Sequence, residues 1–298
     1  MKRLFWKALV RSESALLKLL SPLRGPDLSA ILDNDLERVL DRPRELQIFP
    51  TAVTPVAKVQ SLFARLHPVL SGKDLIRIGP EGDGGYLIPD DLEGVTACFS
   101  PGVSITSGFE EQCAERGLKV FMADASVDGP PVANPAFSFI KKFIGGTTRD
   151  EFITLDDWVL QSLPESESDL LLQMDIEGFE FEVLNSISTS LLKRFRIIVI
   201  EFHYLERLFC EPLFPLYALA FERLLETHDC VHNHPNNFSP PMTVDGLRFL
   251  PMAELTFLRK DRVQHQGYAK VFPHPLDRDN TNKPTTVLPE IHYQNSWK

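Results

Sequence analysis

The sequence predicts an α/β protein built around a mostly parallel sheet with helices on both faces. Short apolar runs alternate with helical patterns from about residue 74 onward, which is typical of parallel strands joined by helices. The apolar run 170–174 ends abruptly at Asp175, and Glu177, Gly178 and a helical pattern follow, as expected where a buried strand leads into a helix. The 298 residues, 43% of them hydrophobic, are enough for one large domain with additions or for two small domains.

Residues 1–70 are predicted to form a helical extension that several prolines interrupt. Residues 1–24 carry six basic side chains against one acid, with leucines and aromatic side chains between them. These charges argue against a cleaved secretory signal, and no apolar run reaches the roughly 18 residues of a spanning helix. One interpretation is an amphipathic helix that packs on the domain or on a second subunit of a homo-oligomer, and the other is peripheral contact with an anionic membrane. Packing is favoured, because apolar faces are buried in protein more often than in lipid.

Residues 71–270 are predicted to form the α/β domain, with each element indicated by its apolar spacing. The expected strands are 75–78, 86–88, 94–100, 118–122, 137–144, 170–174, 197–202, 230–233 and 247–258, and the expected helices are 56–66, just before the domain, 109–116, 155–163, 179–192 and 213–227. No helix separates the last two strands, so they are expected to pair as an antiparallel hairpin at the sheet edge. Residues 271–298, rich in Pro, Asn, Asp and His, are predicted to be an extended tail.

Charge and cysteine content argue against several classes of protein. The net charge of -10 argues against a general nucleic-acid binder, whose surface would be basic. The four cysteines are far apart and none forms a CxxC pair, so neither a zinc knuckle nor a disulfide framework is indicated. Scattered thiols fit a reducing cytoplasm, and we therefore expect a cytoplasmic protein, either free or held peripherally at a membrane.

Two turns are candidates for binding a nucleoside cofactor. Gly102 follows one predicted strand and Asp124 ends the next, 22 residues later. In nucleoside sites such a glycine lets the backbone approach the ligand, and the acid accepts hydrogen bonds from the ribose. Because a full GxGxxG motif is absent, a nucleoside without a pyrophosphate is favoured, and S-adenosylmethionine is the common one. The second turn, Asp83-Gly84-Gly85, is either a loop against the ligand or a plain turn before a strand.

Polar side chains follow three successive predicted strands at their C-terminal ends. Asp175 and Glu177 follow the first, Glu201 and His203 the second, and His232 the third. Asp175 alone is equally well explained as the N-cap of the next helix, but the repetition on three strand ends favours binding or catalysis. A histidine or carboxylate there can act as a general base, and the less favoured alternative is a divalent metal held by oxygen and nitrogen ligands.

These motifs, taken together and in order, resemble the FkbM family of S-adenosylmethionine-dependent methyltransferases. The resemblance covers residues 77 to 260, and its most specific part is the stretch 175–180. The motifs that carry it are Arg77-Ile78-Gly79, Asp83-Gly84-Gly85-Tyr86, Ser100-Pro101-Gly102-Val103, Phe109-Glu110, Asp124, Thr154-Leu155-Asp156, Met174-Asp175-Ile176-Glu177-Gly178-Phe179-Glu180 and Glu201-Phe202-His203. The resemblance implies a Rossmann-like, seven-stranded sheet with an antiparallel last strand. It also implies methyl transfer to a hydroxyl of a saccharide or a natural product.

The resemblance also implies roles for single residues. Gly102 and Glu110 would lie in the cofactor loop, Asp124 would hold the ribose, and Asp175 would lie where cofactor and acceptor meet. A hydroxyl acceptor must lose its proton as it attacks. His203 is the first candidate for that base.

The remaining catalytic assignments and the alternatives concern the same strand ends. His232 is the second candidate for the base, and Glu201 is placed to orient either imidazole. The leading hypothesis is an S-adenosylmethionine-dependent O-methyltransferase with a small-molecule or glycan acceptor and no metal. The alternatives are a metal-dependent enzyme of another class, such as a hydrolase using Asp175, Glu201, His203 and His232, and a non-catalytic domain of the same fold.

Overall fold

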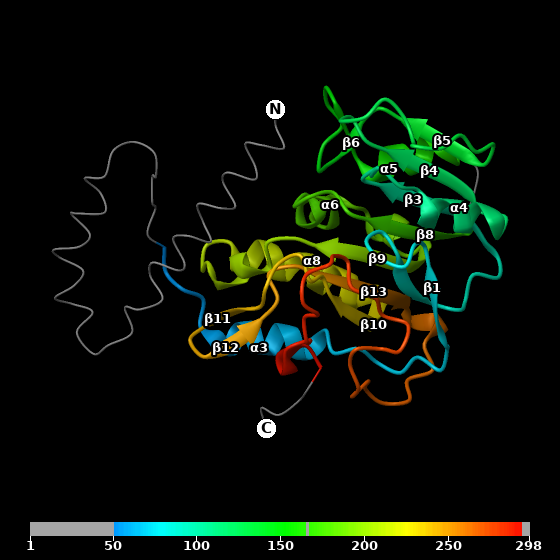
Figure 1. The fold of residues 1–298 in the computed structure, drawn as a ribbon. Helices are drawn as coiled ribbons and strands as arrows, with labels where there is room; N and C mark the ends of the chain where they lie inside the picture. Colours follow the sequence, from blue (N-terminus) through cyan, green and yellow to red (C-terminus); the bar gives the residue numbers. More distant parts are fainter. Residues whose placement is uncertain (1–50, 165–166, 294–298) are drawn as a thin grey trace. The chain divides into compact units, whose positions relative to one another are not determined.

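The computed structural model describes residues 51–164 and 167–293, so most of the predicted N-terminal extension, including residues 1–24, lies outside the described residues. A seven-stranded sheet forms the centre, in the order β10-β13-β9-β8-β3-β4-β5 (Figure 1). The strands are β3 (Val95–Pro101), β4 (Lys119–Ala123), β5 (Phe137–Ile140), β8 (Asp169–Met174), β9 (Phe195–Phe202), β10 (His228–Pro235) and β13 (Ala253–Arg259). β13 runs antiparallel to both of its neighbours, while β8 pairs in parallel with β3 and β9. The predicted mixed sheet with an antiparallel last strand is confirmed.

The two faces of the sheet are covered differently. One hydrophobic core joins the sheet to the helices on its first face, among them α5, α6 and α8, and it contains the buried Trp158 and Phe221. A second core joins the other face to α4 and to the hairpin of β1 (Leu75–Ile78) and β2 (Tyr86–Pro89), and it contains Phe109 and Tyr86. The helices are α3 (Val56–Arg65), α4 (Gly108–Glu115), α5 (Leu155–Ser162), α6 (Glu180–Ser186), α7 (Thr189–Leu192) and α8 (Phe214–Thr227). Both faces are therefore covered, one of them partly by strands instead of helices.

Within residues 51–164 and 167–293, three two-stranded sheets accompany the central one. They pair β1 (Leu75–Ile78) with β2 (Tyr86–Pro89), β6 (Phe143–Ile144) with β7 (Phe152–Ile153), and β11 (Met242–Val244) with β12 (Leu247–Phe249). The expected strand 137–144 is thus divided between β5 and β6. The expected strand 247–258 is divided between β12 and β13, so a small hairpin separates β10 from its antiparallel partner β13.

The predicted helix 179–192 is two helices. α6 ends at Ser186, and α7 begins after Ser188, whose side-chain oxygen accepts a hydrogen bond from the backbone N–H of Leu191 at 3.1 Å. The carboxylate of Asp156 in turn accepts a hydrogen bond from the Ser188 backbone N–H at 2.9 Å. A serine that caps a new helix offers the backbone an alternative to continuing the old one, which explains the break.

The segment 271–293 has little regular secondary structure, but it packs on the domain instead of leaving it. Leu288, Ile291 and His292 are buried, and the ring Nε2 of His67 donates to the backbone carbonyl of Ile291 at 2.8 Å. Within the described part of the chain, no helix combines the length and apolar character needed to cross a membrane.

Candidate active site

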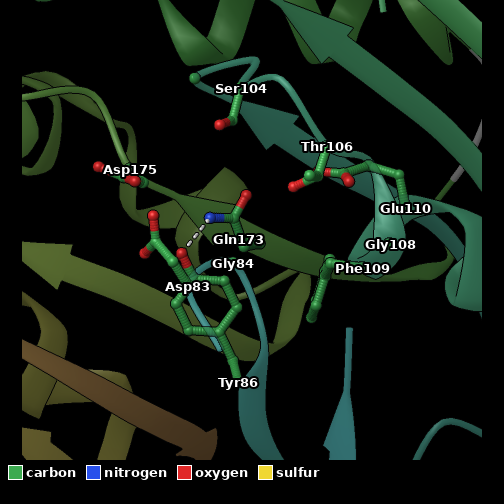
Figure 2. A pocket seen from close by; sticks show the side chains of 11 residues that line it. Asp83, Gly84, Tyr86, Ser104, Thr106, Gly108, Phe109, Glu110, Gln173 and Asp175 are labelled. Atoms are coloured by element: carbon green, nitrogen blue, oxygen red, sulfur yellow. Dashed lines mark hydrogen bonds between the residues drawn. The ribbon is translucent and has the colours of Figure 1, made fainter. Parts of the chain in front are cut away.

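A pocket opens at the C-terminal ends of β3 and β8, beside the first turn of α4 (Figure 2). The chain passes from β3 to β4 on one side and later returns to β8 on the other, so this is the point where the strand order reverses. Open α/β sheets bind ligands at such points. The pocket holds about 440 Å³ of space, part of it open to solvent. Its lining residues are Asp83, Gly84, Tyr86, Gly102, Ser104, Thr106, Gly108, Phe109, Glu110, Gln173 and Asp175.

Gly102 is required by the close approach of two backbone segments. Its φ is +97°, and a Cβ atom at this position would lie 1.7 Å from the carbonyl oxygen of Asp175. The backbone N–H of Asp175 also donates to the carbonyl of Pro101 at 3.3 Å. The sequence suggested that this glycine makes room for a ligand. The structure shows that it makes room for Asp175, which brings that residue into the wall of the pocket.

Buried polar side chains form the floor of the pocket. Ser100 Oγ lies 2.5 Å from Glu110 Oε1 and 2.7 Å from Gln173 Oε1, and Gln173 Nε2 donates to the Tyr86 hydroxyl at 3.2 Å. One serine hydroxyl carries a single hydrogen, so it can donate to only one of these two oxygens. Burial raises the pKa of Glu110, and a protonated Glu110 can donate to Ser100, which then donates to Gln173. The chain of hydrogen bonds thus fixes four side chains.

The turn before β2 contributes two of the three residues predicted for it. Asp83 and Gly84 line the pocket, whereas Gly85 does not. A Cβ atom on Gly85 would lie 2.1 Å from the carbonyl oxygen of Pro80 and 2.5 Å from the guanidinium of Arg77. Arg77 donates to that same carbonyl, so Gly85 is needed to hold the turn together rather than to contact a ligand.

Asp124 lies at the end of β4 and orders the neighbouring loops. Its two carboxylate oxygens accept hydrogen bonds from the backbone N–H groups of Val103 at 3.1 Å and Ser126 at 2.6 Å. It is not among the residues that line the pocket. The ribose contact predicted for Asp124 stays a prediction, and its observed contacts hold the loop that follows β3.

A histidine surrounded by acids lies next to the pocket, and we call it the histidine–carboxylate cluster: Asp175, Glu177, Glu180, Glu201 and His203. The His203 Nδ1 atom is 3.1 Å from Glu180 Oε1. The His203 Nε2 atom is 3.5 Å from Glu201 Oε1, 3.8 Å from Glu177 Oε2 and 3.9 Å from Asp175 Oδ1. The predicted meeting of β8 and β9 strand-end residues is therefore observed, with Asp175 shared between cluster and pocket.

Asp175 does not cap the helix that follows it. The residue at the N-cap of α6 is Phe179, which makes no side-chain capping bond. Instead the first residue of α6, Glu180, accepts hydrogen bonds from the backbone N–H groups of Ile176 at 3.2 Å and Gly178 at 3.0 Å. Glu180 thus closes the turn after β8 and leaves the Asp175 carboxylate available to the pocket.

The pKa values of the cluster are strongly shifted. Burial lowers the pKa of His203, but the hydrogen bond to Glu180 and the charges of Glu180, Glu201 and Asp175 outweigh it and raise the pKa to about 10. Burial raises the pKa of Asp175 to about 7, although the charge of His203 opposes this. Burial, followed by the charges of Asp175 and Glu254, raises the pKa of Glu201 well above its usual range. Near neutral pH, Asp175 can therefore take up and release a proton while His203 keeps its own.

His232 is placed differently from the expectation. β13 lies between β10, which carries His232, and β9, which leads to His203. His232 Nε2 is 2.8 Å from Asp277 Oδ1, and the ring stacks near Phe272. The strand insertion separates the two imidazoles, so His232 joins the segment 271–293 to the sheet instead of joining the histidine–carboxylate cluster.

Sequence reasoning missed several polar residues around this site. Glu254 on β13 is in register with Glu201 on one side and with His234 on the other. Asn236 Nδ2 donates to Glu201 Oε1 at 3.0 Å, and Asn280 Nδ2 donates to Glu254 Oε1 at 2.5 Å. Glu254 could have been identified from the sequence, because it is an acid within the mostly apolar run 253–258. Asn280 had none, because it lies in the segment that was expected to be a tail.

Comparison with known proteins gives one family match. The family model of the methyltransferase FkbM domain matches residues 108–226, a stretch that contains Asp124, Asp175, Glu201 and His203. No curated protein matches the chain. Among solved structures, one titled "Crystal Structure of EvdMO1" shares 9% sequence identity at a TM-score of 0.26, and the alignment covers 72% of this chain but only 49% of that chain. The chain thus spans about half the length of the protein in that structure. The fold of this chain is assigned from its own central sheet. Residues 108–226 thus match the FkbM methyltransferase domain, as the resemblance in the sequence implied.

Proposed function

We propose that the protein is an S-adenosylmethionine-dependent O-methyltransferase that acts on a hydroxyl group of a saccharide or a similar small polyol. The observation that carries the proposal is the position of Asp175. This residue lies at the C-terminal end of β8 within the matched domain, lines the pocket at the strand-order reversal, and has a pKa raised to about 7. An acid with that pKa is suited to exchange a proton at neutral pH.

The chemistry of the pocket fits the proposed cofactor. S-adenosylmethionine, when bound, supplies an electrophilic methyl group and carries positive charge on its sulfonium and amino groups. The carboxylates of Asp83 and Asp175 line the pocket and favour positive charge electrostatically. The hydroxyls of Ser104 and Thr106 also line it and are suited to bind polar groups of a nucleoside. Phe109 supplies an apolar surface beside them.

Asp175 is the proton acceptor that the structure favours. Methyl transfer to a hydroxyl requires that the acceptor lose its proton, and a carboxylate with a pKa of about 7 can take it. His203, the first candidate from the sequence, has a pKa of about 10 and already carries a proton at neutral pH. Its charge instead stabilises the ionised form of Asp175. His203 is therefore a positioning residue in this proposal, and Glu201 supports its ring from the other side.

The surroundings of the cluster favour an acceptor rich in hydroxyl groups. Glu201, Asn236, Glu254 and Asn280 are joined in pairs by hydrogen bonds, and Asp83 connects to Asn280 at 3.4 Å. Carboxylate and amide groups can both accept hydrogen bonds from hydroxyls. Such groups also hold an acceptor in line with the reacting methyl group, which supplies much of the rate in a displacement.

The proposal also covers the cellular location of the protein and the molecules that it contacts. Cys98, Cys113 and Cys230 are buried free thiols, which supports a reducing, cytoplasmic location. The net charge of -10 supports a small acceptor rather than nucleic acid. We propose that residues 1–24 mediate either subunit packing or peripheral contact with a membrane.

Calorimetric titration of the purified, metal-stripped protein with S-adenosylmethionine and S-adenosylhomocysteine tests the proposal. Binding of both at micromolar concentration is expected, and it would reduce the remaining problem to a screen of saccharide acceptors for methyl transfer. Absence of binding to either compound would overturn the proposal and favour the alternative of a non-methylating enzyme or a binding domain.

A further inference from the structure

We infer that the histidine–carboxylate cluster is a binding site for a divalent transition-metal ion such as Mn²⁺, held by His203 Nε2, Asp175 Oδ1 and the carboxylate of Glu201. The role of such an ion would rest on the proposed function, since it would lie where the acceptor hydroxyl must approach Asp175. The existence of the metal site does not rest on the proposed function, because the site is defined by its side chains alone. Asp175, Glu180 and His203 offer ligand atoms that all lie within 4.8 Å of one another, and Glu201 adds a carboxylate oxygen 3.5 Å from His203 Nε2.

The hydrogen bond of His203 to Glu180 prepares the other ring nitrogen for a metal. Glu180 Oε1 accepts two backbone hydrogens, from Ile176 and Gly178, in addition to its 3.1 Å contact with His203 Nδ1. A carboxylate oxygen in this position is an acceptor, so Nδ1 carries the hydrogen and donates it. The proton that Nε2 also carries at neutral pH would leave when the ion binds, because a metal ligand must offer a lone pair. Metal-binding histidines usually donate one ring N–H to a carboxylate in this way, which fixes the ring and directs the second nitrogen to the ion.

The distances around His203 Nε2 suit a shared small ion better than direct hydrogen bonds. Glu201 Oε1, Glu177 Oε2 and Asp175 Oδ1 lie 3.5, 3.8 and 3.9 Å from this nitrogen. Hydrogen bonds between such groups are normally about 2.7–3.2 Å long. Two ligand atoms that are each about 2.1 Å from one ion, at a tetrahedral angle, lie about 3.4 Å apart. Ligands around a larger cation, such as an ammonium group, would be spaced more widely.

Buried oxygen atoms without hydrogen-bond partners are a second observation that favours a cation at this position. Asp175 Oδ1 and Glu201 Oε2 are buried and have no hydrogen-bond partner among the described residues. The Glu201 side chain is only 6% exposed, and its other oxygen accepts from Asn236. A buried carboxylate oxygen without a donor is costly, and a cation between the carboxylates removes that cost.

The shared residue Asp175 connects this site to the pocket. Its Oδ1 atom is turned toward His203 and is buried, while the side chain as a whole is 32% exposed and lines the pocket. Glu177 is 79% exposed at the rim, where it can add a further ligand. An ion in this position would neutralise the acids and bind the oxygen of an acceptor hydroxyl. Mixed imidazole and carboxylate ligands suit Mn²⁺ among the common divalent ions.

Titration of the metal-stripped full-length protein with Mn²⁺, followed by electron paramagnetic resonance, tests the inference. One site of micromolar affinity is expected, with nitrogen modulation of the spin echo from the His203 ring. Glu201→Gln should weaken Mn²⁺ binding at least tenfold, and His203→Gln should abolish the nitrogen signal. Glu254→Gln is the matched control, because it removes a buried carboxylate from the neighbouring strand; it should change the affinity by less than threefold.

The outcomes separate this inference from the proposed function. S-adenosylhomocysteine binding is measured on the same samples, and circular dichroism checks that each variant is folded. Cofactor binding without Mn²⁺ binding would overturn the metal site and leave the methyltransferase in place. Mn²⁺ binding that survives Glu201→Gln and His203→Gln unchanged would also overturn it, because the ion would then be bound elsewhere. Mn²⁺ binding at His203 without cofactor binding would support the metal site and reject the methyltransferase.

Discussion

At the scale of single residues, the site depends on one contact between two backbones. Gly102 has no side chain, so the end of β3 can lie directly against the carbonyl of Asp175. The same contact brings Asp175 into the pocket wall, where burial raises its pKa to about 7. Gly102, which leaves space for the backbone, thus lies in direct contact with Asp175, which can exchange a proton.

Gly102→Ala should destabilise the fold and displace Asp175. A left-handed φ costs a non-glycine residue about 1–2 kcal/mol, and the overlap with the Asp175 carbonyl adds to that. Gly117→Ala is the control, since Gly117 has a φ of +84° but a Cβ atom there would have no neighbour within 4 Å. Urea unfolding should show a larger loss for Gly102→Ala than for Gly117→Ala, and only the former should lower cofactor affinity. Equal losses would mean that the strand end adjusts easily.

Asp124→Ala should weaken S-adenosylmethionine binding by roughly 1–3 kcal/mol, the scale of a lost hydrogen bond to a charged group. The observed hydrogen bonds to Val103 and Ser126 would be lost, and with them the ribose contact that the resemblance predicts. Asp128→Ala is the control, because Asp128 is an exposed acid a few residues later that pairs with Lys141. Calorimetry gives the two affinities, and unchanged binding in Asp124→Ala would remove this residue from the cofactor site.

The pH dependence of methyl transfer should identify the proton acceptor. Asp175 accepts a proton only when ionised, so the rate should rise with pH through about 7 and then level off. Asp175→Asn should lower turnover and remove this rise. Initial rates between pH 5 and 10.5 provide the measurement. A rate that continues to rise toward pH 10 would assign the proton transfer to His203, whose pKa is about 10.

At the scale of secondary-structure elements, a group of ion pairs fixes the end of β2 against the sheet. Asp91 follows β2 and is buried; it accepts hydrogen bonds from Arg262 at 2.7 Å and from Lys73 at 3.1 Å. Arg196 on β9 donates to the backbone carbonyl of Asp91 at 2.9 Å and is also paired with Asp169 on β8. These contacts lock the hairpin that carries Asp83 and Gly84 to the strands that carry the cluster.

Asp91→Asn should cost about 3 kcal/mol of unfolding free energy at pH 7, the lower end of the range for breaking a buried pair. Burial alone would raise the pKa of Asp91, but the hydrogen bonds from Arg262 and Lys73 outweigh it and lower the pKa below its usual value. A lowered carboxyl pKa stabilises the protein above the unfolded value near 4, and this stability is lost as the pH falls through the folded value. Urea unfolding from pH 2.5 to 7 should therefore show a flatter acid limb for Asp91→Asn, with the exposed neighbour Asp90→Asn unchanged. Parallel curves for the wild type and Asp91→Asn would contradict this.

The sequence predicted the elements whose apolar pattern matches their environment, and the errors have physical causes. The largely buried strand β8 and the fully buried strand β9 were evident as apolar runs that end in acids. The break between α6 and α7 was missed because Ser188 interrupts an otherwise continuous helical pattern with a cap. The meeting of Asp175 and His203 followed from strand ends sharing one edge, whereas the exclusion of His232 depended on β13 inserting between β10 and β9, which spacing along the chain does not reveal.

At the scale of the whole molecule, the segment 271–293 completes the site from outside the sheet. Asp277 accepts from His232 at 2.8 Å and lies 3.4 Å from His234, while Asn280 reaches Glu254 and Asp83. Burial would raise the pKa of Asp277, but the two histidines outweigh it and hold the pKa well below its usual range. The predicted tail is therefore part of the wall around the acidic side chains, as far as residue 293.

Asp277→Asn should cost roughly 1.5–3 kcal/mol of unfolding free energy, the range for a hydrogen bond to a charged group. Asp279→Asn is the matched control, because Asp279 lies two residues away and its side chain accepts a hydrogen bond from the exposed Thr285. Chemical denaturation gives both values, and hydrogen exchange should show faster exchange in residues 271–293 for Asp277→Asn alone. Similar exchange in the two variants would show that the segment is held by its other contacts.

The antiparallel strand β13 has a consequence for the order in which the protein can fold during synthesis. β9 and β10 leave the ribosome first, yet they do not pair with each other, because β13 must lie between them. Until residues 253–259 emerge, the nascent chain exposes the hydrogen-bonding edge of β9 that β13 will cover, and β10 lacks its partner strand in the central sheet. Two unpaired edges invite association with other chains. We therefore expect the incomplete nascent chain to bind chaperones. A chain that ends before residue 253 should aggregate instead of folding to a smaller sheet.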